Sequence, residues 1–179
     1  MSGKTSEKVP IGGLEFVKLI PNHLEFRKKL TTLGLKDAEL QIAQFAQHIG
    51  LCWLHLGRAH LKDAIQASKT KNIRAGYSRA YYAAYNISKA VRYIVTGAVS
   101  MKGDDHGKAG AELPGDFPDV PKWAQVITRL YEQRLRADYD NWGGKSAKFT
   151  VSLEEAVSDA KAFDVASKKY LTEKFGIKL

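Results

Sequence analysis

Residues 73–96 carry the feature that most constrains the fold, an apolar stripe that recurs every three or four residues. Side chains at that spacing line one face of an α-helix and need a second surface to cover them. Gly97 follows the last of them, and glycine is the residue most often found just past the end of a helix. The sequence therefore predicts a long amphipathic helix here. Its buried stripe consists of Tyr77, Ala80, Tyr81, Ala84, Ile87, Val91, Ile94 and Val95.

A second apolar periodicity, from Asp37 to about Lys69, predicts another long helix. Gly50 and Gly57 lie inside it, and glycine weakens a helix interior by about 1 kcal/mol relative to alanine. We therefore expect a bend or a break at one of these two glycines. A short turn around Lys71-Asn72 then leads into residues 73–96.

Two more helices are expected toward the C-terminus, over about residues 121–139 and 152–175. Pro121 suits the first turn of one, and Ser152 with Glu155 matches the capping box that opens the other. No segment shows the sustained alternation of a β-strand. These patterns predict an all-α bundle of four to five helices, with a long loop before the third main helix.

Glycine and proline concentrate in two stretches that we expect to lie outside the long helices. Residues 1–22 contain three glycines and two prolines, and predict a flexible N-terminal segment. Residues 97–121 hold five of the 15 glycines and three of the five prolines, which predicts the long loop. The remaining residues, 23–179, are expected to form a single helical domain.

The composition favours a cytoplasmic protein that is not embedded in a membrane. No apolar run approaches the ~18 residues that a transmembrane helix needs, and the N-terminus lacks the apolar stretch of a secretory signal. Cys52 is the only cysteine, so an internal disulfide is excluded and a reducing compartment is favoured. Its neighbours Leu51 and Trp53 are apolar, and we expect Cys52 to be a small core residue.

The net charge of +9 is unevenly placed. Residues 1–100 hold 15 Lys and Arg against six Asp and Glu, whereas residues 101–179 hold 13 of each. A positive half of this kind attracts a polyanion or an acidic partner protein. Scattered cations on a solvated surface give the same composition, and both interpretations stay open.

Arg134 is an unusual residue because it continues the apolar stripe of the third main helix. A charge withdrawn from water needs a partner, and Asp138 follows one turn later on the same face. One interpretation is a buried ion pair that holds the bundle together. The other is an arginine at the mouth of a groove, where it binds phosphate.

A polar row runs beside the apolar stripe of residues 73–96. Arg79, Tyr82, Asn86 and Lys89 are spaced by three, four and three residues and therefore share one helix face. If this row faces Arg134, the two helices form an anion-binding groove. A solvated helix face shows the same pattern.

The histidines divide into two groups. His48, His55 and His60 lack the spacing of a helical zinc site, so we expect them in ordinary core or surface roles and predict no metal. His106 lies in a polar stretch of the predicted loop. A loop histidine acts as an acid or base if the loop folds over a groove, and is otherwise a solvated residue.

Two stretches of sequence together resemble a known family. Residues 78–85 read SRAYYAAY and are similar to the SRxYYAxF helix of a prokaryotic subgroup of HEPN domains. Residues 130–140 read LYEQRLRADYD and are similar to the R-x-x-A-D-Y helix of that subgroup. His106 falls where the subgroup often carries a loop histidine. The resemblance covers roughly residues 55–172.

The resemblance implies an all-α bundle that dimerises through its motif helices. Many HEPN proteins are metal-independent RNases of toxin–antitoxin, CRISPR and antiphage systems, often encoded beside a minimal nucleotidyltransferase, and they need no cofactor. In their mechanism the RNA 2′-hydroxyl attacks the adjacent phosphate. An arginine stabilises the charge, and a histidine separated from it by four to six intervening residues assists proton transfer.

This sequence departs from that pattern, because positions 139, 140 and 141 are Tyr, Asp and Asn. Either His106 supplies the missing imidazole, or Asp138 or Tyr139 supports altered chemistry, or the site binds RNA or a nucleotide without cutting. The first outcome describes an active endoribonuclease, and the last a binding module or degenerate RNase. The catalytic candidates are Arg134, His106, Asp138 and Tyr139, and the candidate RNA- or phosphate-binding residues are Arg79, Tyr82, Asn86 and Arg136.

Overall fold

Seven α-helices make up the part of the chain that the structure, a computed structural model, describes, namely residues 12–140 and 148–179. The predicted all-α bundle is confirmed, although the helices outnumber the four to five expected. The three additional helices have only seven to ten residues, too few for a periodic pattern to stand out. The helices are α1 (Gly13–Leu19), α2 (His23–Thr32), α3 (Lys36–Lys69), α4 (Ile73–Thr96), α5 (Asp105–Ala111), α6 (Val120–Tyr139) and α7 (Leu153–Phe175).

The four long helices begin and end close to the predicted positions. The helix predicted over residues 73–96 is α4, and Gly97 ends it in the left-handed conformation, with a φ of 84°. Ser152 caps α7, since its side chain accepts a hydrogen bond of 3.1 Å from the backbone N–H of Glu155. These ends were predictable because each depends on one residue type in one local conformation.

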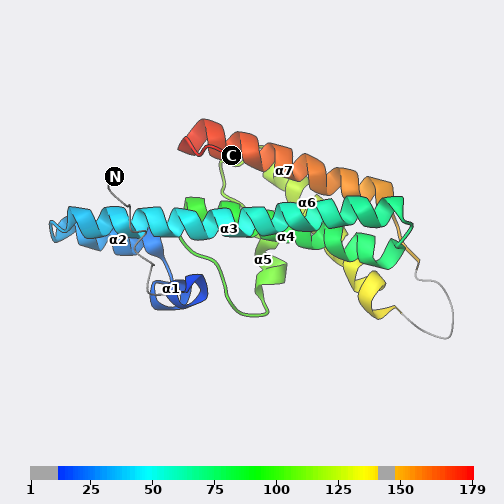
Figure 1. The fold of residues 1–179 in the computed structure, drawn as a ribbon, viewed down its shortest axis with the longest axis horizontal. Helices are drawn as coiled ribbons and strands as arrows, with labels where there is room; N and C mark the ends of the chain where they lie inside the picture. Colours follow the sequence, from blue (N-terminus) through cyan, green and yellow to red (C-terminus); the bar gives the residue numbers. More distant parts are fainter. Residues whose placement is uncertain (1–11, 141–147) are drawn as a thin grey trace, which may run out of the picture.

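Helix α4 is the centre of the bundle. Figure 1 shows α3 and α4 running side by side along the long axis of the molecule, with α7 beside them. Helices α3, α5, α6 and α7 all pack against α4. The apolar stripe of α4 is therefore covered on several sides, and its tyrosines and alanines are part of the main core.

The expected break at Gly50 or Gly57 does not occur, because α3 continues through both residues. The two glycines serve the packing of α3 on α4 instead. A Cβ at Gly57 would lie 2.7 Å from Cγ1 of Ile87 and 3.0 Å from the carbonyl oxygen of Ala83, and a Cβ at Gly50 would overlap Ile94. The loss in helix propensity is offset by the close approach of the two longest helices.

The described part of the N-terminal segment is folded. Helix α1 buries Phe16 and Val17 against Ile49 of α3 in a second, smaller apolar cluster. Helix α2 is fastened to the end of α4, where the backbone N–H of His23 donates to the carbonyl of Gly97 over 2.9 Å. The flexible segment was expected over residues 1–22; residues 1–11 of it lie outside the described residues.

The segment predicted as one long loop, residues 97–121, contains helix α5.

No described helix of the bundle is long and apolar enough to cross a membrane.

Candidate functional site

Helix α5 is held onto α4 by a buried cluster of charges. Asp105, the first residue of α5, accepts two hydrogen bonds from Arg92, over 3.0 and 3.1 Å, and both side chains are 1% exposed. Lys89 adds a second cation, with its Nζ 3.6 Å from Asp105 Oδ2. Burial alone would raise the pKa of Asp105, but the hydrogen bonds and charge of Arg92 outweigh it and lower that pKa below 3.8. The carboxylate therefore stays charged and fixes the start of α5.

The C-terminal half of α5 is fixed by main-chain contacts. The hydroxyl of Ser88 on α4 donates to the carbonyl of Ala109. Gly110 lies against α6, where a Cβ would be only 3.0 Å from the carbonyl oxygen of Ala124. His106 is thus carried by a helix packed on both α4 and α6. This corrects the expectation of a flexible, polar loop around His106.

The imidazole of His106 lies among the tyrosines of α4 and α6. Its Nδ1 is 2.6 Å from the hydroxyl of Tyr81, and its ring centroid is 4.6 Å from that of Tyr85 and 5.9 Å from that of Tyr131. Desolvation, followed by the charge of Arg134, lowers the pKa of His106 below 6.5. The ring is therefore mainly neutral at neutral pH. Its Nε2 forms no hydrogen bond with the described residues.

Arg134 lies on α6, partly exposed, and faces α4. Its Nε is 2.7 Å from Asp138 Oδ2, the ion pair expected from their spacing, although the N–H is not aligned for a hydrogen bond. Its Nη2 donates to the hydroxyl of Tyr82 over 3.0 Å. The guanidinium also lies over the rings of Tyr82 and Tyr139, at 5.5 and 5.3 Å from their centroids. Burial alone would lower the pKa of Arg134, but Tyr82, Asp138 and Tyr139 raise it, so the side chain stays charged.

The end of α6 is held in place by a side chain of α4. Arg74 donates to the carbonyl oxygens of Ala137 and Asp140, over 2.6 and 2.8 Å. Cations at a helix C-terminus satisfy carbonyl groups that have no partner within the helix. This contact keeps the segment from Arg134 to Asp140 against α4.

His60 belongs to the same cluster, which was not expected from its sequence spacing. Its Nδ1 is 3.1 Å from Nη1 of Arg79, and its ring centroid is 5.7 Å from that of Tyr82. The register around the connecting turn gives only part of this contact. Gly57 faces Ile87 across the two antiparallel helices, so the position opposite His60 is residue 84, which is close to Tyr82 but five residues from Arg79.

The remaining candidates lie apart from the cluster or are already engaged. Asn86 is buried and donates from Nδ2 to the carbonyl of Tyr82, one turn earlier in α4. Arg136 donates to the carbonyl of Lys148 over 2.9 Å. Lys89 is part of the charge cluster under α5. The polar row predicted along α4 is therefore split, since only Arg79 and Tyr82 reach the surroundings of Arg134.

We define the candidate site as the cluster in which Arg134 and the two histidines share the tyrosines of α4. Guanidinium groups bind phosphate, and tyrosine rings stack on unpaired bases. A neutral imidazole with a free nitrogen takes up a proton. The arrangement is therefore suited to a phosphodiester of a single-stranded nucleic acid. Its residues are Tyr81, Tyr82, His106 and Arg134, with His60 and Arg79 beside them.

A metal centre is not evident in this part of the molecule. Within residues 12–140 and 148–179, no three His, Cys, Asp or Glu side chains gather closely enough to hold a metal ion.

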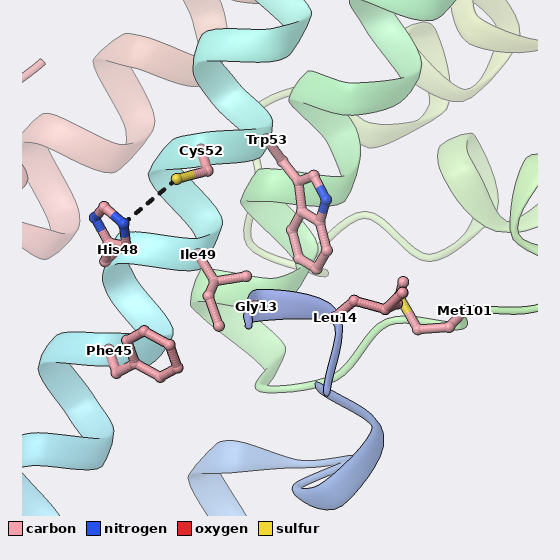
Figure 2. Close-up of a pocket in the computed structure, with 8 residues that line it drawn as sticks. All are labelled: Gly13, Leu14, Phe45, His48, Ile49, Cys52, Trp53 and Met101. Atoms are coloured by element: carbon pink, nitrogen blue, oxygen red, sulfur yellow. Dashed lines mark hydrogen bonds between the residues drawn. The ribbon is translucent and has the colours of Figure 1, made fainter. Parts of the chain in front are cut away.

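A hollow away from the candidate site lies between α1 and α3, and Figure 2 shows the side chains around it. It has a volume of about 510 Å³ and a largely apolar wall. Cys52 is exposed at this hollow, with its Sγ 3.6 Å from Nε2 of His48. The expectation that Cys52 is a core residue is therefore wrong. Successive residues in a helix point about 100° apart, so the apolar neighbours Leu51 and Trp53 did not determine which way Cys52 points.

Comparison with known proteins gives no relative: no family model, curated protein or solved structure matches the chain.

Proposed function

We propose that this protein is a HEPN-type RNA-associated protein, and that the candidate site cleaves RNA without a metal ion. The observation that carries the proposal is the environment of His106. Its Nδ1 is hydrogen-bonded to Tyr81, and its ring centroid lies 6.3 Å from that of Tyr82, the tyrosine that accepts a hydrogen bond from Arg134. The all-helical bundle and the motifs in residues 78–85 and 130–140 support the family part of the proposal.

The proposed site differs from the family pattern in the helix that carries the catalytic histidine. Position 139, where the family's histidine is expected, is a tyrosine whose ring lies over Arg134. In our proposal the proton carrier comes from α5 instead, through His106. Asp138 and Tyr139 then hold the guanidinium and take no proton themselves.

The proposed reaction is a transphosphorylation within the RNA strand. Nε2 of His106 accepts the proton of the 2′-hydroxyl while the 2′-oxygen bonds to the adjacent phosphorus. Arg134 stabilises the negative charge that develops on the phosphate oxygens. The bond from phosphorus to the 5′-oxygen breaks, which leaves a 2′,3′-cyclic phosphate and a 5′-hydroxyl. Tyr82, the half-buried tyrosine of the site, stacks on an unpaired base, whereas the fully buried Tyr81 orients His106.

A second candidate function, RNA or nucleotide binding without cleavage, is favoured by one specific observation. Arg134 already pairs with Asp138 and donates to Tyr82, which satisfies part of its charge and one of its donors. In this form the protein acts as a homodimer or in a complex with a partner, such as a cognate nucleotidyltransferase of a toxin–antitoxin or antiphage system.

The test is cleavage of a single-stranded RNA by the purified full chain in the presence of a chelator. We expect products that end in a 2′,3′-cyclic phosphate, and loss of cleavage in Arg134→Ala and in His106→Ala. Lys161→Ala, an exposed cation of α7, and His55→Ala, an exposed histidine of α3, are the matched controls. Absence of cleavage with salt-sensitive RNA binding supports the second candidate. If the protein neither cleaves nor binds RNA, both candidate functions are contradicted.

A further inference from the structure

The 5′-oxygen that leaves in the proposed reaction needs a proton. An alkoxide is a poor leaving group, and a positioned acid typically accelerates such a departure by about 10²- to 10⁴-fold. His106 already acts as the base that accepts the proton of the 2′-hydroxyl. An in-line displacement places the leaving oxygen on the opposite side of the phosphorus, so a second group is required there.

His60 has the chemistry and the position for this role. It lies on α3, whereas His106 lies on α5, and both helices pack against α4. The two rings share one neighbour, Tyr82, at centroid distances of 5.7 Å for His60 and 6.3 Å for His106. The hydroxyl of Tyr82 is the group that accepts the hydrogen bond of Arg134. A phosphate held by Arg134 thus has an imidazole in reach from each of two helices.

The contact with Arg79 determines the tautomer of His60. Arginine only donates hydrogen bonds, so Nδ1 of His60 must be the acceptor, and the proton of the neutral ring is on Nε2. This Nε2 makes no hydrogen bond within the described residues. When a phosphate draws Arg79 away, Nδ1 is free to take a second proton, and the ring becomes an acid.

We infer that His60 is the general acid of the proposed site, which protonates the 5′-oxygen of a single-stranded RNA as that oxygen leaves. This inference rests on the proposed function. In the step, the 2′-oxygen–phosphorus bond forms as its proton passes to His106. The phosphorus–5′-oxygen bond breaks, its electron pair stays on the 5′-oxygen, and the proton on Nε2 of His60 passes to that oxygen. Exchange with water then restores both histidines.

The charges around His60 favour easy proton loss. Desolvation, followed by the charge of Arg79, lowers the pKa of His60, and Asp63 on the same helix acts in the opposite direction. Tyr82 is the other titratable side chain that faces it from α4.

The test compares two substrates of the same sequence, an RNA and an analogue whose 5′-bridging oxygen is replaced by sulfur. A thiolate leaves without protonation, so an acid is needed only for the RNA. His60→Asn keeps an oxygen that can accept from Arg79, and His60→Gln is a second variant if the first does not fold. We expect His60→Asn to lose at least about 100-fold in kcat on RNA and less than about fivefold on the sulfur analogue. His106→Asn is expected to lose activity on both substrates, and His55→Asn on neither.

Equal losses of His60→Asn on both substrates overturn the inference and assign His60 a structural or binding role. Full activity on RNA overturns it as well, and in both cases the proposed function survives. Absence of RNA cleavage by the wild-type protein overturns the proposed function and the role of His60 with it.

Discussion

Two arginine–carboxylate pairs lie at α4, one between α4 and α5 and the other on α6, and they differ in burial and geometry. Arg92 and Asp105 are both 1% exposed and are joined by two hydrogen bonds. Arg134 and Asp138 are 14% and 28% exposed and are joined by one short contact along a single helix. The first pair connects two helices, whereas the second connects two turns of one helix.

The difference shows how to separate a structural arginine from a functional one. A buried pair is costly to break, because the charge that remains is buried, unpaired and not solvated by water. A partly exposed pair contributes about 1 kcal/mol or less and exchanges readily for another anion. Of the two arginines, Arg134 is therefore the one able to change its partner for a phosphate.

The largest expected effect is on stability, in Asp105→Ala. The change leaves Arg92 and Lys89 buried. Arg92 keeps the hydroxyl of Ser88 at 3.3 Å and the half-exposed carboxylate of Glu112 at 3.5 Å. We expect the free energy of unfolding to fall by about 3–5 kcal/mol, measured by urea denaturation. Asp138→Ala is the control and should cost about 1 kcal/mol or less. Equal losses in the two variants would remove the distinction between the pairs.

Acid titration checks the same pair independently. Because the pKa of Asp105 is lower in the folded protein than its ordinary value of 3.8, the stabilisation is complete above that value. It is lost as the pH falls through the folded-state pKa. Asp105→Asn should therefore flatten the stability curve below about pH 4.

The next effect is on catalysis, in Arg134→Ala. Removal of a charged group that stabilises a transition state lowers kcat by about 10²- to 10³-fold. The free energy of unfolding should change by about 1 kcal/mol or less, since the pair with Asp138 is partly exposed. The measurement combines RNA cleavage kinetics with urea denaturation. A large loss of stability without loss of cleavage would make Arg134 structural.

A smaller effect on the rate of RNA cleavage is expected when the pH is changed. His106 must be neutral to accept a proton, so the rate rises as the pH rises through its pKa. His60 must be protonated to donate, so the rate falls as the pH rises through its own pKa. Both pKa values are lowered from 6.5, which places the maximum of kcat/KM below pH 6.5. A maximum near pH 8 would contradict these two roles.

The smallest effect concerns Asp138→Asn. The change removes the carboxylate that competes with RNA for Arg134, so we expect RNA to bind about two- to fivefold more tightly. Fluorescence anisotropy at low salt measures the change. Arg136→Gln is the comparison, because its guanidinium donates to the Lys148 carbonyl away from the site. Weaker binding by Asp138→Asn would show that the carboxylate orients Arg134 for RNA.

The sequence predicted the long helices well and the site less well, for a physical reason. Helix α4 has a continuous apolar stripe with a glycine at its end, so its pattern and its burial agree. Helix α5 is held by an ion cluster and by the fit of Gly110 against α6, and neither leaves a periodic apolar pattern. The sequence therefore predicts a loop around His106, and predicts an acid or base role for this residue only if the loop folds over a groove.

Contacts between helices were the least predictable part of the site. The pair of Arg134 and Asp138 was expected because both residues lie on one helix, where spacing determines distance. The contact of His60 with Arg79 depends on how α3 packs against α4. The register around the connecting turn places residue 84 opposite His60, so the contact also depends on how far the Arg79 side chain reaches along α4, which the sequence does not specify.

The attachment of α5 has a consequence for how the protein responds to heat. A helix of seven residues is not stable by itself, and α5 stays docked chiefly through Asp105, Ser88 and Gly110. The four long helices bury their apolar stripes against one another without it. Local opening of α5 therefore requires less energy than global unfolding. The proposed RNA cleavage and the fold should then have separate melting temperatures, and the lower one is determined by Asp105, the carboxylate next to His106.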